Sequence, residues 1–247
     1  MSEAAGTTGA GQRPSFRIGS VLGQSFSIAL KNVVPFVILA LIITSPPLLY
    51  ELVALDPIEY GTNWFVVIAG IVLTSLVTAT VVYGTVQELR GRHADIAGSI
   101  ARGLPRLFPV ILVTIVMWVA ILLASILLII PGFIVATITW VAVPVAVVEK
   151  PGIFASLGRS AELTKGNRWR VFALLLIAFV LQAAIGGLIG FVIGLIFGNS
   201  LTSILIAEYA GNAVAVAFTG VIIAVGYYQL RVANDGVDID QIAAVFD

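Results

Sequence analysis

The chain has 247 residues, of which 60% are hydrophobic and 11% charged, and its mean hydropathy is +1.10. This composition excludes an ordinary soluble domain and predicts a protein that crosses a membrane several times. The formal net charge of zero gives no general attraction to nucleic acid, and the absence of cysteine excludes disulfides and thiolate metal sites. Short segments of alternating polarity, typical of a membrane barrel, are absent from the sequence, so we expect an all-α fold.

The predicted elements begin after a tail. Residues 1–15 are small and polar, which predicts disorder, and we expect no signal peptide because no compact apolar core precedes a cleavage site. Six apolar runs follow, at about residues 33–55, 63–86, 107–130, 132–148, 170–197 and 207–230. We predict a polytopic transmembrane helical bundle with one domain at residues 16–232 and a short tail at residues 233–247.

Proline and glycine residues within and between these runs predict turns and bends. Pro131 and Gly132 predict a tight hairpin between the third and fourth spans, because proline disfavours helix in the residue before it and glycine permits a turn. The Ser-Pro-Pro sequence at residues 45–47 predicts a kink or break in the first span. Pro144 predicts a bend in the fourth, so neither span is expected to be a straight rod.

The basic residues are divided between the two sides of the predicted bundle. All 13 precede the first span, lie between spans two and three or four and five, or follow the sixth. The opposite connections carry Glu51, Asp56, Glu59 and Glu208 and no base. By the positive-inside rule, both termini and the two long loops are predicted to be cytoplasmic.

Three segments with the periodicity of an amphipathic helix precede spans one, three and five. They cover about residues 18–29, 96–107 and 153–165, and each is predicted to lie in the headgroup layer on the cytoplasmic side. In the last segment Arg159 and Lys165 oppose the apolar face. That face consists of Ile153, Leu157 and Ala161.

The order of surface helix, span and span, repeated three times, indicates a threefold internal repeat. The alternative is that any protein with this orientation places basic amphipathic residues at the inner ends of its helices. Identity among the three segments is low, so the sequence leaves both interpretations open.

Two segments carry a resemblance to a known family. The first contains Pro131-Gly132, Trp140, Pro144, Glu149, Gly152, Ala155 and the block RSAELTKGNRW at residues 159–169. The second is GYYQLR at residues 226–231, followed by DGVD at residues 235–238. They resemble the membrane domain of some bacterial glycerophosphodiester phosphodiesterases and of related stand-alone inner-membrane proteins. The resemblance covers about residues 15–240, although that family more usually has an acid at the position of Gln229.

The resemblance implies a multi-pass protein of a bacterial inner membrane. It does not imply catalysis, because in those enzymes the hydrolase is a separate soluble domain, for which 247 residues with six spans leave no room. We therefore expect a non-enzymatic accessory or scaffold module in envelope-lipid metabolism or homeostasis. The alternative is a transporter or permease for a small or lipidic substrate.

The sequence contains no recognisable catalytic or cofactor-binding constellation. His93 is the only histidine, and with Asp95 and Ser99 it forms only a local grouping on an inner loop, without the further ligands of a metal site or the context that orients a triad. A Walker-type phosphate loop is also missing, which argues against ATP-driven transport by this chain alone. We expect no enzyme activity, no cofactor and no metal.

A cluster of basic residues is a candidate site for an anionic lipid headgroup. Arg159, Lys165, Arg168 and Arg170 surround Trp169. Bases clustered near an anionic surface gain about 1 kcal/mol each, and tryptophan is typical of the interfacial belt. The alternative interpretation is simple topological anchoring.

The fifth span carries a glycine at every fourth position, namely Gly186, Gly190, Gly194 and Gly198. Such a face has no side chains and lets another backbone approach closely. The face is predicted to pack within the chain; a homo-oligomer interface and a groove for a lipid tail are the alternatives.

Gln182, Glu208 and Asn212 are the candidate polar residues at membrane depth. A sixth span that begins near residue 201 would place Glu208 inside the membrane, where it could bind a proton or a cation. A span that begins near residue 209 would place it at the outer boundary, the interpretation we favour because 22 residues remain to cross. A transporter would need a polar cavity that passes Gln182, whereas a scaffold needs only a filled apolar core.

Overall fold

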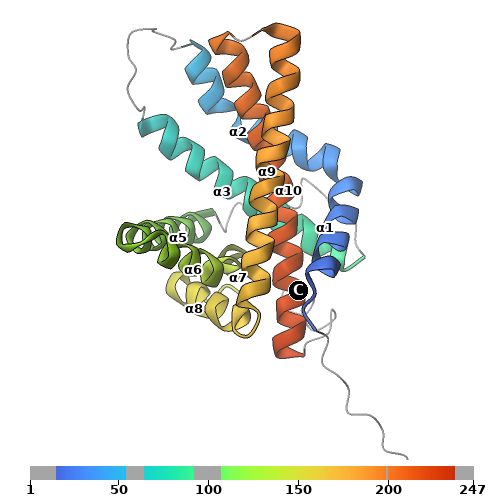
Figure 1. The fold of residues 1–247 in the computed structure, drawn as a ribbon, viewed down its shortest axis with the longest axis vertical. Helices are drawn as coiled ribbons and strands as arrows, with labels where there is room; N and C mark the ends of the chain where they lie inside the picture. Colours follow the sequence, from blue (N-terminus) through green and yellow to red (C-terminus); the bar gives the residue numbers. More distant parts are fainter. Residues whose placement is uncertain (1–14, 54–63, 92–106, 199, 237–247) are drawn as a thin grey trace, which may run out of the picture.

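The computed structural model describes residues 15–53, 64–91, 107–198 and 200–236, which are helical apart from short connections (Figure 1). Six segments are long and apolar enough to cross a membrane, with α6 and α7 together forming the fourth, so the predicted all-α, six-span fold is confirmed. The predicted helix at 96–107 and the group at His93 lie outside the described residues, except for Leu107. The helices are α1 (Ile18–Lys31), α2 (Val33–Val53), α3 (Trp64–Leu89), α5 (Leu107–Leu127), α6 (Ile129–Thr139), α7 (Ala142–Val148), α8 (Ile153–Thr164), α9 (Arg168–Phe197) and α10 (Leu201–Asp235).

The helix α10 is the centre of the arrangement. It packs along α9 as an antiparallel pair and also contacts α1, α2 and α3 (Figure 1). Gln229 near its end donates hydrogen bonds to Ser20 Oγ at 2.9 Å and Gln24 Oε1 at 2.8 Å, so α10 ends beside the first turns of α1. The helix runs to Asp235, three residues past the predicted end of the domain.

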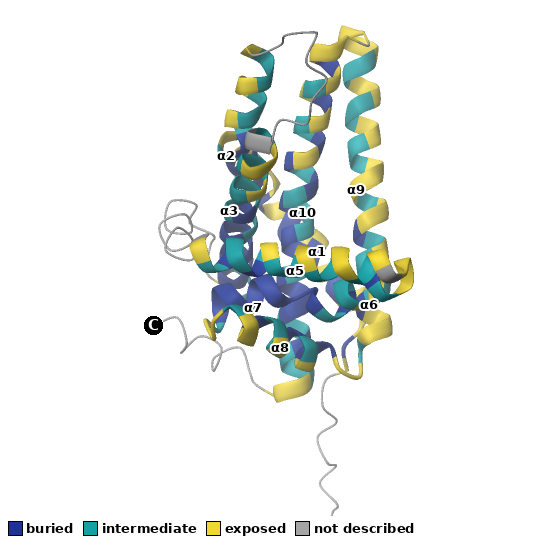
Figure 2. Cartoon of the chain, turned by 90° about the vertical axis from the view of Figure 1, so that its left-hand side faces the viewer, coloured by how far each residue is buried: buried dark blue, intermediate teal, exposed yellow. Residues whose placement is uncertain are grey.

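The α5–α6 hairpin runs crosswise to α9 and α10 in both views (Figures 1 and 2). The short helix α7 is buried between this hairpin, α3 and α10, and α8 packs against α5, α6 and α7. The hairpin and α8 therefore sit together at the end of the molecule where α10 ends.

Pro131 and Gly132 do not form the turn that the sequence predicts. The chain reverses at Leu128, whose backbone is extended, and both residues lie in the first turn of α6. Proline is tolerated there because the N–H groups of a first helical turn have no acceptor within the helix. A Cβ atom on Gly132 would collide with the side chain of Ser125 on α5. The Pro-Gly pair therefore marks a close contact between two helices.

The helix α2 continues through Pro46 and Pro47, so the first span is not broken. Proline has no N–H, and these two residues leave the carbonyl groups of Ile42 and Ile43 without their helical donors. The Ser45 hydroxyl donates to the Ile42 carbonyl at 2.9 Å and replaces one of them. A side-chain hydrogen bond thus preserves the helix where backbone hydrogen bonds are missing.

The fourth span is interrupted, in agreement with the expected effect of Pro144. The helix α6 ends at Thr139 and α7 begins at Ala142. Pro144 lies in the first turn of α7 and cannot donate to the Trp140 carbonyl one turn earlier. The predicted bend is therefore a break between two helices.

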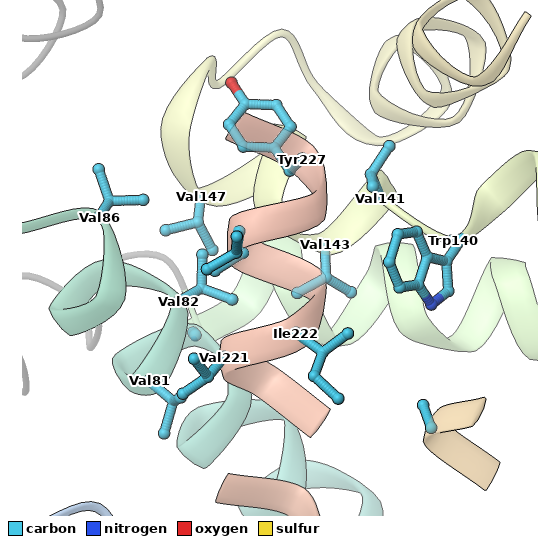
Figure 3. Packing of buried hydrophobic residues seen from close by; sticks show 14 of the residues in the cluster. Val81, Val82, Val86, Trp140, Val141, Val143, Val147, Val221, Ile222 and Tyr227 are labelled. Atoms are coloured by element: carbon cyan, nitrogen blue, oxygen red, sulfur yellow. The ribbon is translucent and has the colours of Figure 1, made fainter. Parts of the chain in front are cut away.

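The core lies where α3, α7 and α10 meet (Figure 3). Val82 of α3, Val145 of α7 and Ile222 of α10 are fully buried. The Trp140 ring packs on the backbone of Gly226, where a Cβ atom would lie 2.6 Å from the ring. Valine side chains of α3 and α7 thus pack against α10 in this region (Figure 3).

Candidate functional site

The helix α8, which the sequence predicts as an amphipathic surface helix, packs against α5, α6, α7 and α10. Ile153 and Leu157 pack against a small cluster formed by Val113, Ala142 and Ala146. The apolar side of α8 therefore faces the protein at these two positions.

Three of the four buried residues of α8 have small polar side chains, and the fourth is Leu163. Ser156, Ser160 and Thr164 are fully buried, whereas Ala161 is only half-buried. The Ser160 hydroxyl donates to the Ile138 carbonyl at 2.7 Å and joins α8 to α6. An apolar periodicity does not predict this face, because serine and threonine hide their hydroxyl groups on helical carbonyls.

Next to α8, a cluster of charged and polar side chains joins α7, α8 and α10. We call it the polar junction, and it consists of Glu149, Arg159, Tyr227, Arg231 and Asp235. Glu149 accepts hydrogen bonds from Arg159 Nε at 3.0 Å and from the Tyr227 hydroxyl at 2.8 Å. Arg159 also donates to Asp235. Arg231 Nε lies 3.7 Å from Asp235 and 3.9 Å from Glu149.

Two bases balance two acids in the polar junction, and the side chains of these four residues are between 12% and 26% exposed. Burial lowers the pKa of Arg159, but Glu149 and Asp235 outweigh burial and raise that pKa above its ordinary value. The guanidinium therefore stays charged and paired. Asn234 adds a hydrogen bond of 2.7 Å to the Leu163 carbonyl, which ties α10 to the end of α8.

The polar junction connects the two segments that carry the family resemblance. Glu149 and Arg159 come from the first segment, and Tyr227, Arg231 and Asp235 come from the second. Sequence reasoning did not assign a shared site to these residues. Two features of the sequence indicate such a site. Acids and bases lie near the ends of the predicted helices, and Arg231 and Asp235 are one helical turn apart.

The other candidate headgroup ligands lie at the turn from α8 to α9. We call Lys165, Arg168, Trp169 and Arg170 the basic turn, and all four are exposed, Trp169 to 84%. Lys165 and Arg168 make no hydrogen bond or ion pair with the described part of the chain, and Arg170 donates to Asn167 Oδ1 at 2.9 Å. Arg159, which the sequence grouped with them, is instead engaged in the polar junction.

The glycine face of α9 borders a groove between α9 and α10. A Cβ atom on Gly211 of α10 would lie 3.1 Å from Gly186 Cα, so the two backbones pack closely there. A Cβ atom on Gly190 would meet nothing within 4 Å, because the groove opens beside it. Gly198 instead ends α9 with a φ of 72°. The groove measures about 220 Å³ and is lined by Gly186, Gly190, Gly194, Ser203, Ile204, Ala207 and Glu208.

Gln182, Glu208 and Asn212 are all exposed, and none forms a hydrogen bond or ion pair with the residues that the structure describes. The helix α10 begins at Leu201, about two turns before Glu208. Gln182 is not among the residues that line the groove, so the three candidate polar residues do not share one cavity. The described residues also contain no group of three or more His, Cys, Asp or Glu side chains that could hold a metal ion.

The fold and these features define a helical membrane protein with six candidate spans. Comparison with protein-family models, with curated proteins and with solved structures finds no match. The resemblance to the membrane domain of glycerophosphodiester phosphodiesterases therefore stays a prediction from the sequence.

Proposed function

We propose that this chain is a non-enzymatic scaffold or accessory module of a bacterial inner membrane that binds anionic lipid headgroups in envelope-lipid metabolism or homeostasis. The observation that carries the proposal is the basic turn, in which three exposed bases flank an exposed tryptophan. Bases of this kind gain binding free energy at an anionic surface, and tryptophan suits the interface.

The polar junction supports this role because it fixes the helix that precedes the basic turn. Arg159 ties α8 to α7 and α10, and Asn234 holds the carbonyl of Leu163, two residues before Lys165. A preorganised set of bases loses less conformational entropy on binding than bases on a mobile loop. The geometry therefore favours a headgroup site over scattered surface charge.

A transporter or permease is the second candidate function, and the groove beside Glu208 is the observation in its favour. The lining of the groove extends along α9 only from Gly194 to Gly186 and does not include Gln182. The centre of the fold is filled by side chains such as Val82 and Ile222, both fully buried. A centre filled by apolar side chains supports the scaffold function over transport, because a transporter needs a polar path through the bundle.

The proposed orientation places the basic turn and both termini on the cytoplasmic side. Since the chain has no cysteine, a Lys165→Cys variant supplies one defined label site. A membrane-impermeant maleimide should label it in permeabilised cells but not in intact cells. Efficient labelling of intact cells would reverse the proposed orientation.

Lipid binding is tested by native mass spectrometry of the purified protein with phosphatidylglycerol and phosphatidylcholine. A triple variant, Lys165→Gln, Arg168→Gln and Arg170→Gln, removes the charges of the basic turn and leaves the polar junction intact. We expect its preference for phosphatidylglycerol to fall by about tenfold to a hundredfold. Lys31→Gln is the control, because Lys31 is an exposed base at the end of α1. An unchanged preference in the triple variant would refute the headgroup site.

A further inference from the structure

The surroundings of Glu208 place this carboxylate within the hydrocarbon layer. Large apolar side chains lie between it and the turn that joins α9 to α10, and they are exposed on the surface of both helices. A membrane boundary at residue 209 would leave all of them in water, whereas a boundary near the turn covers them with lipid. They are Leu195 at 70%, Ile196 at 67%, Phe197 at 71%, Leu201 at 57% and Ile204 at 52% exposure.

No basic side chain of this chain is available to pair with Glu208 at that depth. The sequence has no lysine, arginine or histidine between Arg170 and Arg231, or between Lys31 and Arg90. These intervals contain nearly all of α9 and α10 and all of α2. A carboxylate in hydrocarbon is costly unless it is paired or protonated. A Glu208 carboxylate that stays ionised at this depth must therefore take its counter-ion from outside the chain.

The groove next to Glu208 restricts what that counter-ion can be. Its volume of about 220 Å³ is close to that of roughly seven water molecules, and glycines form one of its walls. Ser203 already donates its hydroxyl hydrogen to the Gly198 carbonyl at 2.5 Å, so it adds no free donor for an anion. A divalent metal would need several oxygen ligands, and Glu208 is the only carboxylate among the residues that line the groove. A slender apolar group with a single positive charge fits best.

We propose that the groove binds an alkylammonium amphiphile, with the ammonium on the Glu208 carboxylate and the alkyl chain along Gly186, Gly190 and Gly194. The chain replaces the side chains that these glycines lack, and the ammonium supplies the missing counter-ion. This site is separate from the proposed headgroup function, because it uses neither the basic turn nor the polar junction.

The site is tested with a spin-labelled octadecylammonium probe in phosphatidylcholine vesicles that contain the protein. Electron paramagnetic resonance gives the motionally restricted fraction of the probe, with the matching spin-labelled octadecyl alcohol as the neutral reference. We expect the ammonium to associate about fivefold more strongly than the alcohol. Glu208→Gln should abolish this preference because it removes the charge, and Gly190→Leu should reduce it because the new side chain fills the groove.

Glu51→Gln is the matched control, because Glu51 lies at the end of α2 and does not line the groove. It should keep the full preference, as should the triple variant of the basic turn, so failure of this site is distinguishable from failure of the proposed function. Competition by phosphatidylethanolamine would identify a lipid amine headgroup as the natural ligand, and its absence would identify a single-chain amine.

Three results would overturn the proposal. The first is equal association of the ammonium and the alcohol with the unmodified protein. The second is a preference that survives both Glu208→Gln and Gly190→Leu while the melting temperatures of both variants match that of the parent. The third is a dimer that cross-linking detects in the parent but not in Gly190→Leu, found together with no preference for the ammonium probe. A second copy of the chain would then occupy the groove.

Discussion

The helices α9 and α10 lie side by side and are the two longest of the described chain, yet they differ sharply in burial. Of the 30 residues of α9, three are buried, whereas α10 buries 14 of its 35. The more hydropathic helix is α9, much of which is coloured as exposed in Figure 2. Large side chains such as Phe179 and Leu188 lie on its surface. The helix with fewer large apolar residues is therefore the one at the centre.

The more apolar helix lies outside because the solvent around the spans is lipid and not water. Lipid tails are as apolar as leucine, so burial within the protein gives a large side chain no transfer free energy, and close packing decides which helix is central. Alanine and glycine predominate among the buried residues of α10. The close approaches at Gly211 and Gly226 show what small residues permit. In this protein, hydropathy marks the face toward lipid, and small residues mark the face toward the protein.

The largest expected difference between the two helices comes from removing the same side chain from each. Ile222 of α10 is fully buried, and Ile196 of α9 is 67% exposed. Ile222→Ala should destabilise the protein by about 3 kcal/mol, because neighbouring helices cannot fill the cavity. Ile196→Ala should change little, because lipid fills the space. Equal shifts of the unfolding midpoint in detergent would contradict the comparison.

Adding one methyl group tests the same contrast in the opposite direction. Gly226→Ala puts a Cβ atom against the Trp140 ring, which should cost about 2 kcal/mol through overpacking. Gly187→Ala on α9 meets open space and should be neutral or slightly stabilising, since alanine is the better helix former. Thermal unfolding of the two variants provides the measurement. A stable Gly226→Ala protein would mean that Trp140 does not pack on α10.

A smaller effect is expected from the polar junction at the end of α10. Arg159→Gln leaves Glu149 and Asp235 with only their longer contacts to Arg231 and should cost about 1 to 2 kcal/mol, less than a fully buried pair because water reaches the site. Glu162→Gln is the control, since Glu162 is 71% exposed and contacts the same arginine at 3.5 Å. If both variants unfold at the parent temperature, the junction does not hold α8 in place.

The smallest expected effect is that of alkaline pH on the polar junction. The pKa of Arg159 is raised in the folded protein, so its stabilising contribution is complete below the ordinary arginine value and is lost only above it. Stability attributable to Arg159 should therefore stay constant from neutral to mildly alkaline pH. Unfolding midpoints of the parent and Arg159→Gln, compared across that range, should keep a constant difference. A difference that narrows there would show that the pairing titrates at much lower pH.

The spans were predictable because each depends on composition over about 20 residues, and only the exact ends were missed. The turn at Leu128 was not predictable in this way, because Pro131 and Gly132 are read as a turn by local rules. Their actual role depends on Ser125 across the hairpin. Local rules consider only the backbone near each residue, whereas Gly132 is required by the close contact of α6 with α5.

The candidate site was predicted only in part. Lys165, Arg168, Trp169 and Arg170 are exposed together, and these residues are consecutive or nearly so in the sequence. Arg159 was grouped with them because it is close in sequence, but its partner Asp235 is 76 residues away. Pairing at that distance depends on how α8 and α10 pack, and helical periodicity contains no information on it.

The contrast between a lipid-facing α9 and a central α10 can be measured directly with nitroxide labels, because the chain has no cysteine to remove. Single cysteines would replace alanines on both helices, Ala183 and Ala184 on α9 and Ala213 and Ala217 on α10. The first two are exposed, and the last two are 1% and 4% exposed. In lipid vesicles, collision with dissolved oxygen should be frequent for labels on α9 and rare for those on α10. Equal collision rates, or higher rates on α10, would contradict the account.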